Sequence, residues 1–195
     1  DAGTSSFWID QTPFLIDAGV GTYTRQTFSK DRYTIWTMQS NYHNLPLING
    51  VPQKHGATYK ATQVQADKRK NTFTANIATA YPAEAEVESW IRSYSLQKGQ
   101  LRISDSFRLT TAKQPNQINF MTWGQVNTEI PGKIQLEVKG KKAFIEYDKQ
   151  LFDVKTETIP LTDPRLSNVW GKSIYRITLT ATNIYKTGKI RAKDI

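Results

Sequence analysis

The sequence offers few side chains suited to chemistry at a site. It contains two histidines, His43 and His55, and no cysteine. Without cysteine there is no disulfide framework, thiolate zinc cluster, iron–sulfur centre or cysteine nucleophile. A serine–histidine–acid triad would need one of the two histidines, and neither lies in a nucleophile elbow of the GxSxG type. The sequence also contains no Walker A loop and no GxGxxG segment. These classes of site are therefore not indicated.

Asp17 and His43 are the pair whose types suit a divalent metal. Asp17 ends the apolar run 14–16, and His43 lies in the segment 40–44, just before an expected strand. Carboxylate oxygen and imidazole nitrogen both bind zinc, but a zinc site needs at least three protein ligands. Asp17 and His43 supply two, and His55, in an expected turn, is a poor third. From the residues alone, a turn-capping Asp17 and a hydrogen-bonded His43 remain open as alternatives.

Aromatic residues are the other candidates. Tyr33 follows Arg32 directly, and a tyrosine beside a cation is a combination that suits acid–base catalysis. The alternative is an ordinary half-buried strand tyrosine, since the chain has nine tyrosines. Four tryptophans suit either stacking on sugar rings or packing in a core: Trp36, Trp90, Trp123 and Trp170.

The charge balance points to an acidic partner. Lys and Arg number 26 against 17 Asp and Glu, giving a formal net charge of +9 and a pI near 9.6. Nucleic acid, anionic lipid and acidic polysaccharide all fit this charge, as does a simple solubility bias. The positive residues form short clusters near expected turns, without a zinc-finger or RNA-binding signature, so nucleic acid is not favoured. No apolar run is long enough to span a membrane.

Alternating apolar and polar residues indicate the elements that position these side chains. The alternation is clear over residues 73–77, 101–109, 134–138 and 175–181, which is typical of strands with one buried face. Asn49-Gly50 suits a type I′ turn, and Lys98-Gly99 and Gly140-Lys141 separate further strand pairs. The sequence therefore predicts an all-β protein, a large antiparallel β-sandwich forming a single domain over residues 1–195.

Three segments depart from this alternation. Residues 82–88 begin with Pro and carry acidic residues in the first turn, which predicts a helix of at most two turns. Residues 113–119 are polar and contain Pro115, which indicates a long loop. Residues 186–195 suit either a tail or a last strand. At most one or two short helices are expected in the whole chain.

Several segments together resemble the C-terminal β-domain of the heparinase II/III-like family. The residues that carry the resemblance are Phe14 to Tyr23, Tyr42-His43-Asn44, Asn49-Gly50, Trp90-Ile91-Arg92, Ile103, Asp105-Ser106-Phe107, Trp170-Gly171 and Tyr175-Arg176-Ile177. The resemblance covers most of residues 1–181.

The resemblance implies a polysaccharide lyase that cleaves uronate-containing chains such as heparin, heparan sulfate or alginate by β-elimination. Such proteins have a helical toroid followed by a β-sandwich, with the active site between them, in the bacterial periplasm or outside the cell. Carried over, Asp17 and His43 become ligands of a zinc ion, and Tyr33 lies near the position of an active-site tyrosine. The implied partners are an acidic polysaccharide and an N-terminal helical domain, with no nucleic acid and no membrane.

The sequence also departs from the family pattern. A His-x-His-Asn segment, which supplies a catalytic histidine and a further metal ligand, would lie just before Asp1, and the helical toroid is absent as well. We therefore expect an incomplete metal site and an isolated chain with little or no activity. The alternatives are a non-catalytic carbohydrate-binding β-sandwich, which would use an aromatic platform independently of Asp17 and His43, and a structural or partner-binding β-domain.

Overall fold

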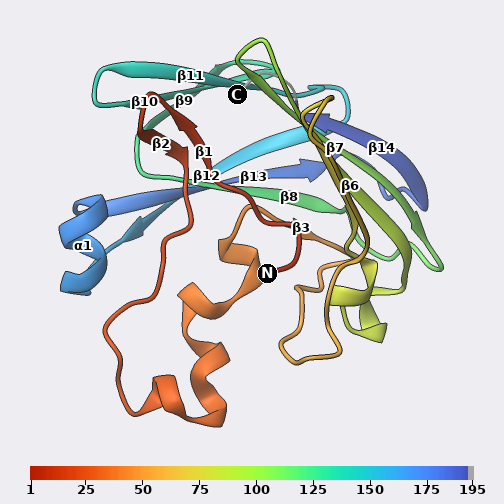
Figure 1. The fold of residues 1–195 in the computed structure, drawn as a ribbon, viewed down its shortest axis with the longest axis horizontal. Coiled ribbons are helices and arrows are strands. Elements are labelled where there is room, and N and C mark those ends of the chain that lie inside the picture. Colours follow the sequence, from red (N-terminus) through yellow and green to blue (C-terminus); the bar gives the residue numbers. More distant parts are fainter. Residues whose placement is uncertain (193–195) are drawn as a thin grey trace.

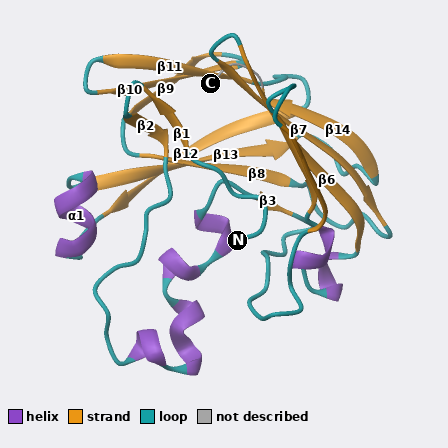
Figure 2. Cartoon of the chain, in the orientation of Figure 1, coloured by secondary structure: helices purple, strands orange, loops and turns teal. Residues whose placement is uncertain are grey.

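The computed structural model describes residues 1–192, and strands dominate the fold (Figures 1 and 2). Two larger antiparallel sheets face each other across the core. The first has the order β14-β7-β6-β5-β4, with bounds Thr187–Ala192, Gln100–Leu109, Val87–Gln97, Thr72–Asn76 and Thr62–Asp67. The second has the order β12-β13-β8-β3, with bounds Phe152–Pro160, Ser173–Ala181, Gln117–Thr122 and Pro46–Leu47. The predicted all-β antiparallel sandwich is therefore confirmed.

Two smaller sheets complete the β-structure. One is the hairpin of β1, Phe7–Ile9, with β2, Thr12–Leu15. The other has the order β11-β10-β9, with bounds Lys141–Glu146, Lys133–Val138 and Gln125–Ile130. Figure 1 shows both above the four-stranded sheet in this view, close to each other. No helix in residues 1–192 is long and apolar enough to cross a membrane.

The core forms because alternating strand residues point to the same side of each sheet. Trp90 and Phe107 come from the five-stranded sheet, and their rings stack with centroids 4.7 Å apart. Phe120 and Ile177 come from the four-stranded sheet and belong to the same buried cluster. Burial of such large apolar side chains is the main favourable term in folding. The four tryptophans considered above contact the core, and Trp90 is fully buried.

The predicted turns occur where their residues permit positive φ. Asn49 and Gly50 have φ of 51° and 76° between the bridged residues Ile48 and Val51. Lys98 and Gly99 have φ of 51° and 77° and join β6 to β7. Such left-handed pairs match the right-handed twist of hairpin strands. The third turn is shifted by one residue, to Lys139-Gly140, because Lys141 is already the first residue of β11.

The short helix predicted within residues 82–88 is confirmed over a shorter span, and the loop predicted at 113–119 is wrong at its C-terminal end. Within residues 82–88, only Ala83–Ala85 form a single 3-10 turn, η6, which ends where Glu86 takes a left-handed conformation and Val87 begins β6. The predicted loop at 113–119 ends early, because Gln117 already pairs with β13 as part of β8. Residues 187–192 form the last strand, while residues 193–195 lie outside the described part.

The α-helix of the described residues, α1, spans Pro164–Trp170 and was not predicted. Its start has a recognisable signal, because Asp163 caps the helix by accepting a hydrogen bond from the Arg165 N–H and Pro164 occupies the first turn. A further 3-10 turn, η5, spans Ala78–Ala80.

Residues 18–42, here called the excursion, leave the sandwich between β2 and β3. It contains four successive 3-10 turns, η1 to η4, with bounds Gln26–Phe28, Lys30–Thr34, Trp36–Met38 and Ser40–Tyr42. Figure 1 shows it in orange, projecting away from the sheets. Asp163 tethers its first half, accepting hydrogen bonds from the Thr22 backbone N–H and from the Thr22 hydroxyl at 2.8 Å.

This tether predicts a pH-dependent contribution to stability. The hydrogen bonds from Thr22 hold the pKa of the Asp163 carboxyl below its usual range. A depressed folded-state pKa stabilises the protein at pH above the ordinary value of about 4, and this contribution is lost as the pH falls through the lower folded-state value. The variant Asp163→Asn keeps a helix-capping side chain and removes the charge.

We therefore expect wild type to unfold at a higher temperature than Asp163→Asn near neutral pH, with the difference shrinking below about pH 4. Thermal unfolding over a pH series measures this, and the Thr22 amide signal provides a local check. A difference in unfolding temperature that stays constant down to strongly acidic pH would contradict the assigned role of the Asp163 charge.

Candidate functional site

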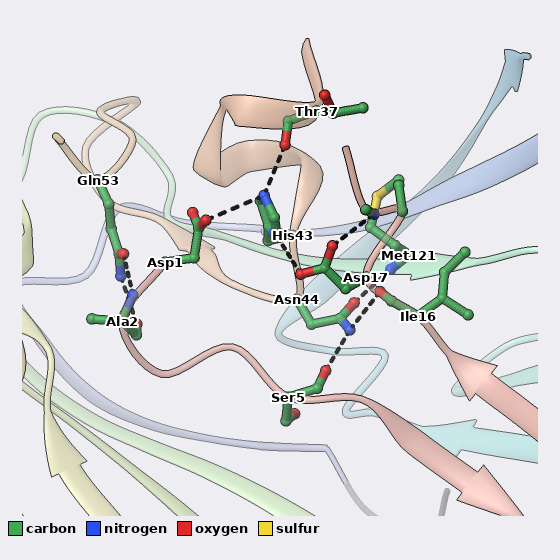
Figure 3. A network of polar contacts seen from close by, with 12 residues as sticks. Asp1, Ala2, Ser5, Ile16, Asp17, Thr37, His43, Asn44, Gln53 and Met121 are labelled. Atoms are coloured by element: carbon green, nitrogen blue, oxygen red, sulfur yellow. Dashed lines mark hydrogen bonds and ion pairs between the residues drawn. The ribbon is translucent and has the colours of Figure 1, made fainter. Parts of the chain in front are cut away.

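His43 is the centre of the candidate site. It follows η4 directly and is buried, with 6% of its surface exposed. Its Nδ1 lies 3.3 Å from Asp17 Oδ2, and its Nε2 lies 3.4 Å from Asp1 Oδ2. Nε2 also lies 3.3 Å from the Thr37 carbonyl oxygen. Figure 3 shows the imidazole between the two carboxylates. The fold thus brings together Asp17 and His43, the two residues proposed from the sequence as a pair.

Asp17 is placed by the end of β2. The preceding residue, Ile16, is buried, and its N–H donates to the Met121 carbonyl of β8 at 2.9 Å. The Asp17 carboxylate then turns toward His43, while its Oδ1 accepts a hydrogen bond from the Gly19 N–H at 2.8 Å. The His43 imidazole beside it holds the pKa of the Asp17 carboxyl below its usual range, outweighing the opposite effect of partial burial. Asp17 is therefore ionised at neutral pH.

Asn44 connects the two sides of this site. Its side-chain amide donates to the Ser5 carbonyl at 2.6 Å and to the Ile16 carbonyl at 3.2 Å. Its Oδ1 accepts a hydrogen bond from the Met121 N–H at 2.6 Å. These bonds, drawn in Figure 3, are buried or partly buried and satisfy backbone groups that have no ladder partner there. One side chain thereby holds the residues adjacent to both Asp17 and His43.

A buried ion pair supports Asn44 from the five-stranded sheet. Arg92 donates to both carboxylate oxygens of Asp105, at 2.8 and 2.6 Å, and donates from Nη1 to the Asn44 carbonyl at 2.8 Å. Both side chains of the ion pair are at most 2% exposed. Burial alone would lower the pKa of Arg92, but the adjacent Asp105 carboxylate raises it, so the guanidinium stays charged.

The pairing of Arg92 with Asp105 can be predicted from the sequence. A two-residue turn at Lys98-Gly99 fixes the register of β6 on β7, so that Gln97 faces Gln100 and Arg92 faces Asp105. Directly opposed residues on antiparallel strands share one face of the sheet, which makes an opposite-charge pair readable from the turn position. The hydrogen bond to Asn44 crosses between sheets and has no such signal.

The donor set of Asp17 and His43 fits a zinc ion. Zinc bonds of about 2.0–2.1 Å in a tetrahedral site place two ligand atoms about 3.3 Å apart. The 3.3 Å separation between Asp17 Oδ2 and His43 Nδ1 matches that spacing. Asp1 contacts the opposite ring nitrogen and so does not complete the set. Among residues 1–192, no three His, Cys, Asp or Glu side chains converge to hold a metal ion.

A cavity of about 430 Å³ adjoins the site. Its wall includes Asp1, which contacts His43, together with Tyr33 and His55. Tyr33 lies in η2 and is 37% exposed, so the alternative of a half-buried strand tyrosine is wrong. His55 does not join Asp17 and His43 but stacks on the Tyr33 ring. The pairing of Tyr33 with His55 links two irregular segments, and no periodicity in the sequence predicts it.

The buried Arg92 charge predicts a stability effect. Removing one member of a buried ion pair leaves an uncompensated charge and typically costs about 3–5 kcal/mol. We expect Arg92→Met to lower the free energy of unfolding by about this amount, and Arg92→Met with Asp105→Leu to lower it less. Chemical denaturation measures both, and the His43 imidazole NMR signals should shift because Arg92 also holds the Asn44 carbonyl.

A matched control is the exposed pair of Arg108 with Glu88 on the same two strands, whose atoms are 4.0 Å apart. Arg108→Met should change the free energy of unfolding by only about 0–1 kcal/mol. An Arg92→Met variant as mild as Arg108→Met would show that the buried pair does not hold the site.

Comparison with known proteins gives matches at the level of structure. No protein-family model and no curated protein sequence matches the chain. Among solved structures, heparan sulfate lyase HepC from Pedobacter heparinus aligns with a TM-score of 0.71 and 14% identity, covering 100% of this chain and 30% of that chain. A mutant of that lyase gives a TM-score of 0.72, with the same identity and coverage. A heparinase III structure gives a TM-score of 0.65 and 14% identity, covering 100% of this chain and 30% of that chain.

These similarities extend over the whole chain, while the chain spans about 30% of the length of these lyases. At 14% identity they establish a shared fold. The chain therefore has the β-sandwich fold of a segment found in heparan sulfate lyases, as its resemblance to the heparinase II/III-like family predicted.

Proposed function

We propose that this chain is the β-sandwich domain of a polysaccharide lyase that cleaves uronate-containing acidic polysaccharides, of the heparan sulfate or alginate type, by β-elimination. The observation that carries the proposal is the meeting of Asp17 and His43, 3.3 Å apart, within a fold shared with heparan sulfate lyases. Asp1 contacts His43 and lines a neighbouring cavity whose wall includes Tyr33. The chain would supply metal ligands and one wall of the cleft. A helical domain would supply the other wall, and the whole lyase would act in the periplasm or outside the cell.

The proposed reaction sets requirements that this chain meets in part. A lyase removes the proton on C5 of a uronate and expels the oxygen on C4. The C5 proton is weakly acidic, so hydrogen-bond donors or cations must neutralise the uronate carboxylate as charge develops. Lys54 is a cationic residue in the cavity wall, and Gln39 and Asn41 are amide donors there.

Tyr33 is the acid–base candidate of this chain. Tyr33 lines the cavity and is partly exposed, which would allow its hydroxyl to meet a bound sugar. A positioned tyrosine can take a proton from carbon or return one to a leaving oxygen, and such transfer typically contributes about 10²–10⁴-fold to the rate. Tyr33 would share this work with residues of the helical domain.

Asp17 Oδ2 and His43 Nδ1 would hold zinc together with ligands from outside residues 1–192. When bound, zinc would supply a structural cross-link rather than a reacting group. Asp17 precedes the excursion and His43 follows it, so the two ligands close this long loop at its base. A zinc ion bound at the base of the loop would reduce the conformational freedom of the loop. It would thereby restrain the segment that carries Tyr33.

If the active site is divided between this chain and a helical domain, the isolated chain should be inactive. Acid–base groups that act as a unit lose nearly all activity when one part is removed. With heparan sulfate or alginate, we expect the chain alone to form no unsaturated product, and the chain joined to its helical domain to form it. The rise in ultraviolet absorbance of the unsaturated uronate measures both. Eliminative cleavage by the chain alone, or none by the joined protein on any uronate polymer, would overturn the proposal.

Metal binding provides a separate prediction. Asp17→Asn and His43→Gln each replace a carboxylate or imidazole zinc ligand by a neutral amide of similar size. We expect each to weaken zinc binding about tenfold or more. Zinc titration followed by the NMR signals of the excursion measures this on the chain itself. Asp10→Asn is the control, because Asp10 is an exposed carboxylate that contacts Lys141. Equal zinc affinity in all three variants and wild type would exclude Asp17 and His43 as ligands.

A further inference from the structure

The ring of Tyr33 is stacked on the imidazole of His55. The two ring centroids are 3.6 Å apart and the planes differ by 7°, which is a close face-to-face contact. The residues come from different segments, Tyr33 from η2 in the excursion and His55 from the loop between β3 and β4. Both line the cavity of about 430 Å³. The contact therefore joins the excursion to the body of the protein at the wall of the candidate site.

The segment around Tyr33 provides little packing of its own. None of the residues of η2, Lys30–Thr34, is buried. The Tyr33 hydroxyl takes part in none of the hydrogen bonds found among residues 1–192. Arg32, on the same turn, places its guanidinium 5.5 Å from the Tyr33 ring centroid. An exposed aromatic side chain with so few fixed contacts would sample several rotamers unless a neighbour restrains it.

The segment that carries His55 is anchored much more firmly. The side chain of Gln53 accepts from the Ala2 N–H and donates to the Ala2 carbonyl, both at 2.8 Å. The Gln53 N–H donates to the Ser40 hydroxyl at 2.8 Å, and the Lys54 N–H donates to the Ala80 carbonyl at 3.1 Å. These bonds fix the two residues before His55, so the imidazole can act as a fixed surface for the tyrosine ring.

We propose that His55 is a positioning residue for Tyr33. Its imidazole restrains the phenol ring so that the hydroxyl stays in the cavity, where it would meet a bound uronate. This inference rests on the function proposed above and deepens it, because it assigns to His55 a role in the reaction through Tyr33 and not through contact with the sugar.

The stacking also distinguishes this role from that of a sugar-binding platform. An aromatic platform must present a free ring face to the sugar. His55 covers one face of Tyr33, with ring centroids 3.6 Å apart, and the Arg32 guanidinium also lies over the ring, 5.5 Å from its centroid. In the proposed role Tyr33 would act through its hydroxyl, which suits proton transfer or hydrogen bonding.

The first test measures the stack on the chain itself, by the NMR shifts of the Tyr33 ring protons, identified by their loss in Tyr33→Phe. The stacked imidazole should move them upfield. We expect His55→Ala to abolish this displacement and His55→Phe to keep it, because a phenyl ring stacks without donating or accepting hydrogen bonds. Lys54→Ala is the control, since the Lys54 ammonium lies over Tyr59 and should leave the Tyr33 shifts unchanged.

The second test measures catalysis in the lyase that joins this chain to its helical domain. A displaced catalytic group can cost up to about 100-fold, so we expect His55→Ala to lower kcat by about 10- to 100-fold with KM nearly unchanged. His55→Phe should recover most of the lost kcat. A raised KM with unchanged kcat, or a His55→Phe variant as impaired as His55→Ala, would overturn the positioning role, since either points to direct contact of the imidazole with the substrate.

The two tests separate this inference from the proposed function. If the joined protein cleaves no uronate polysaccharide, the lyase proposal fails, and the role assigned to His55 in that reaction fails with it, even where the ring shifts confirm the stack. If the joined protein is active but the Tyr33 shifts do not respond to His55→Ala, the lyase proposal stands and the positioning role of His55 is wrong.

Discussion

The hydrogen bonds of Asn44 are the constraint on which the candidate site depends. Its side chain binds the backbone of Ser5, Ile16 and Met121, which lie in the N-terminal segment, directly after β2 and in β8. Its own carbonyl accepts from Arg92 of the five-stranded sheet. These four segments meet at a place where strand ladders have ended, so an amide with two donors and an acceptor is the side chain that satisfies them. Asp17 directly follows Ile16, and His43 directly precedes Asn44 itself.

This arrangement explains why an ion pair is buried between Arg92 and Asp105. Burying Arg92 with Asp105 costs desolvation that a pair of apolar side chains would avoid. The guanidinium donates from all three nitrogens. Two of them bind Asp105, and Nη1 donates to the Asn44 carbonyl. An apolar replacement could fill the volume but would leave that carbonyl without a partner. The ion pair therefore connects the five-stranded sheet to the site through the Asn44 carbonyl.

The sequence predicts the sandwich well because alternation and turn residues act locally. The strands around Ile103, Leu136 and Ile177 follow from their period of two, and Asn49-Gly50 and Lys98-Gly99 mark turns at the residues observed. The excursion is different. Its four 3-10 turns bury only a few side chains, among them Thr27, Thr37 and Ser40, so no apolar period marks them. The excursion is held by contacts distant in sequence, which local patterns cannot predict.

The same distinction applies to the candidate site. Asp17 and His43 could be nominated from their types and from a family resemblance, but the contact between them depends on Asn44 and on the fold around it. The pairing of Tyr33 with His55 had no signal at all, because it joins an excursion to a loop through side chains alone. Residue types thus indicate which chemistry is available, while distant hydrogen bonds decide which groups meet.

The charge of the whole chain and the charge of the cavity wall differ. The net charge of +9 acts at long range and would favour the approach of a polyanion in a salt-sensitive manner. The cavity wall is nearly balanced, since it contains Asp1 as well as Lys54, and most of its other polar groups are neutral, such as Gln39, Asn41 and Gln53. Neutral amides distinguish between ligands by the direction of their hydrogen bonds rather than by charge. Attraction of an acidic polymer and recognition of a particular sugar within it would therefore be separate properties of this domain, set by different residues.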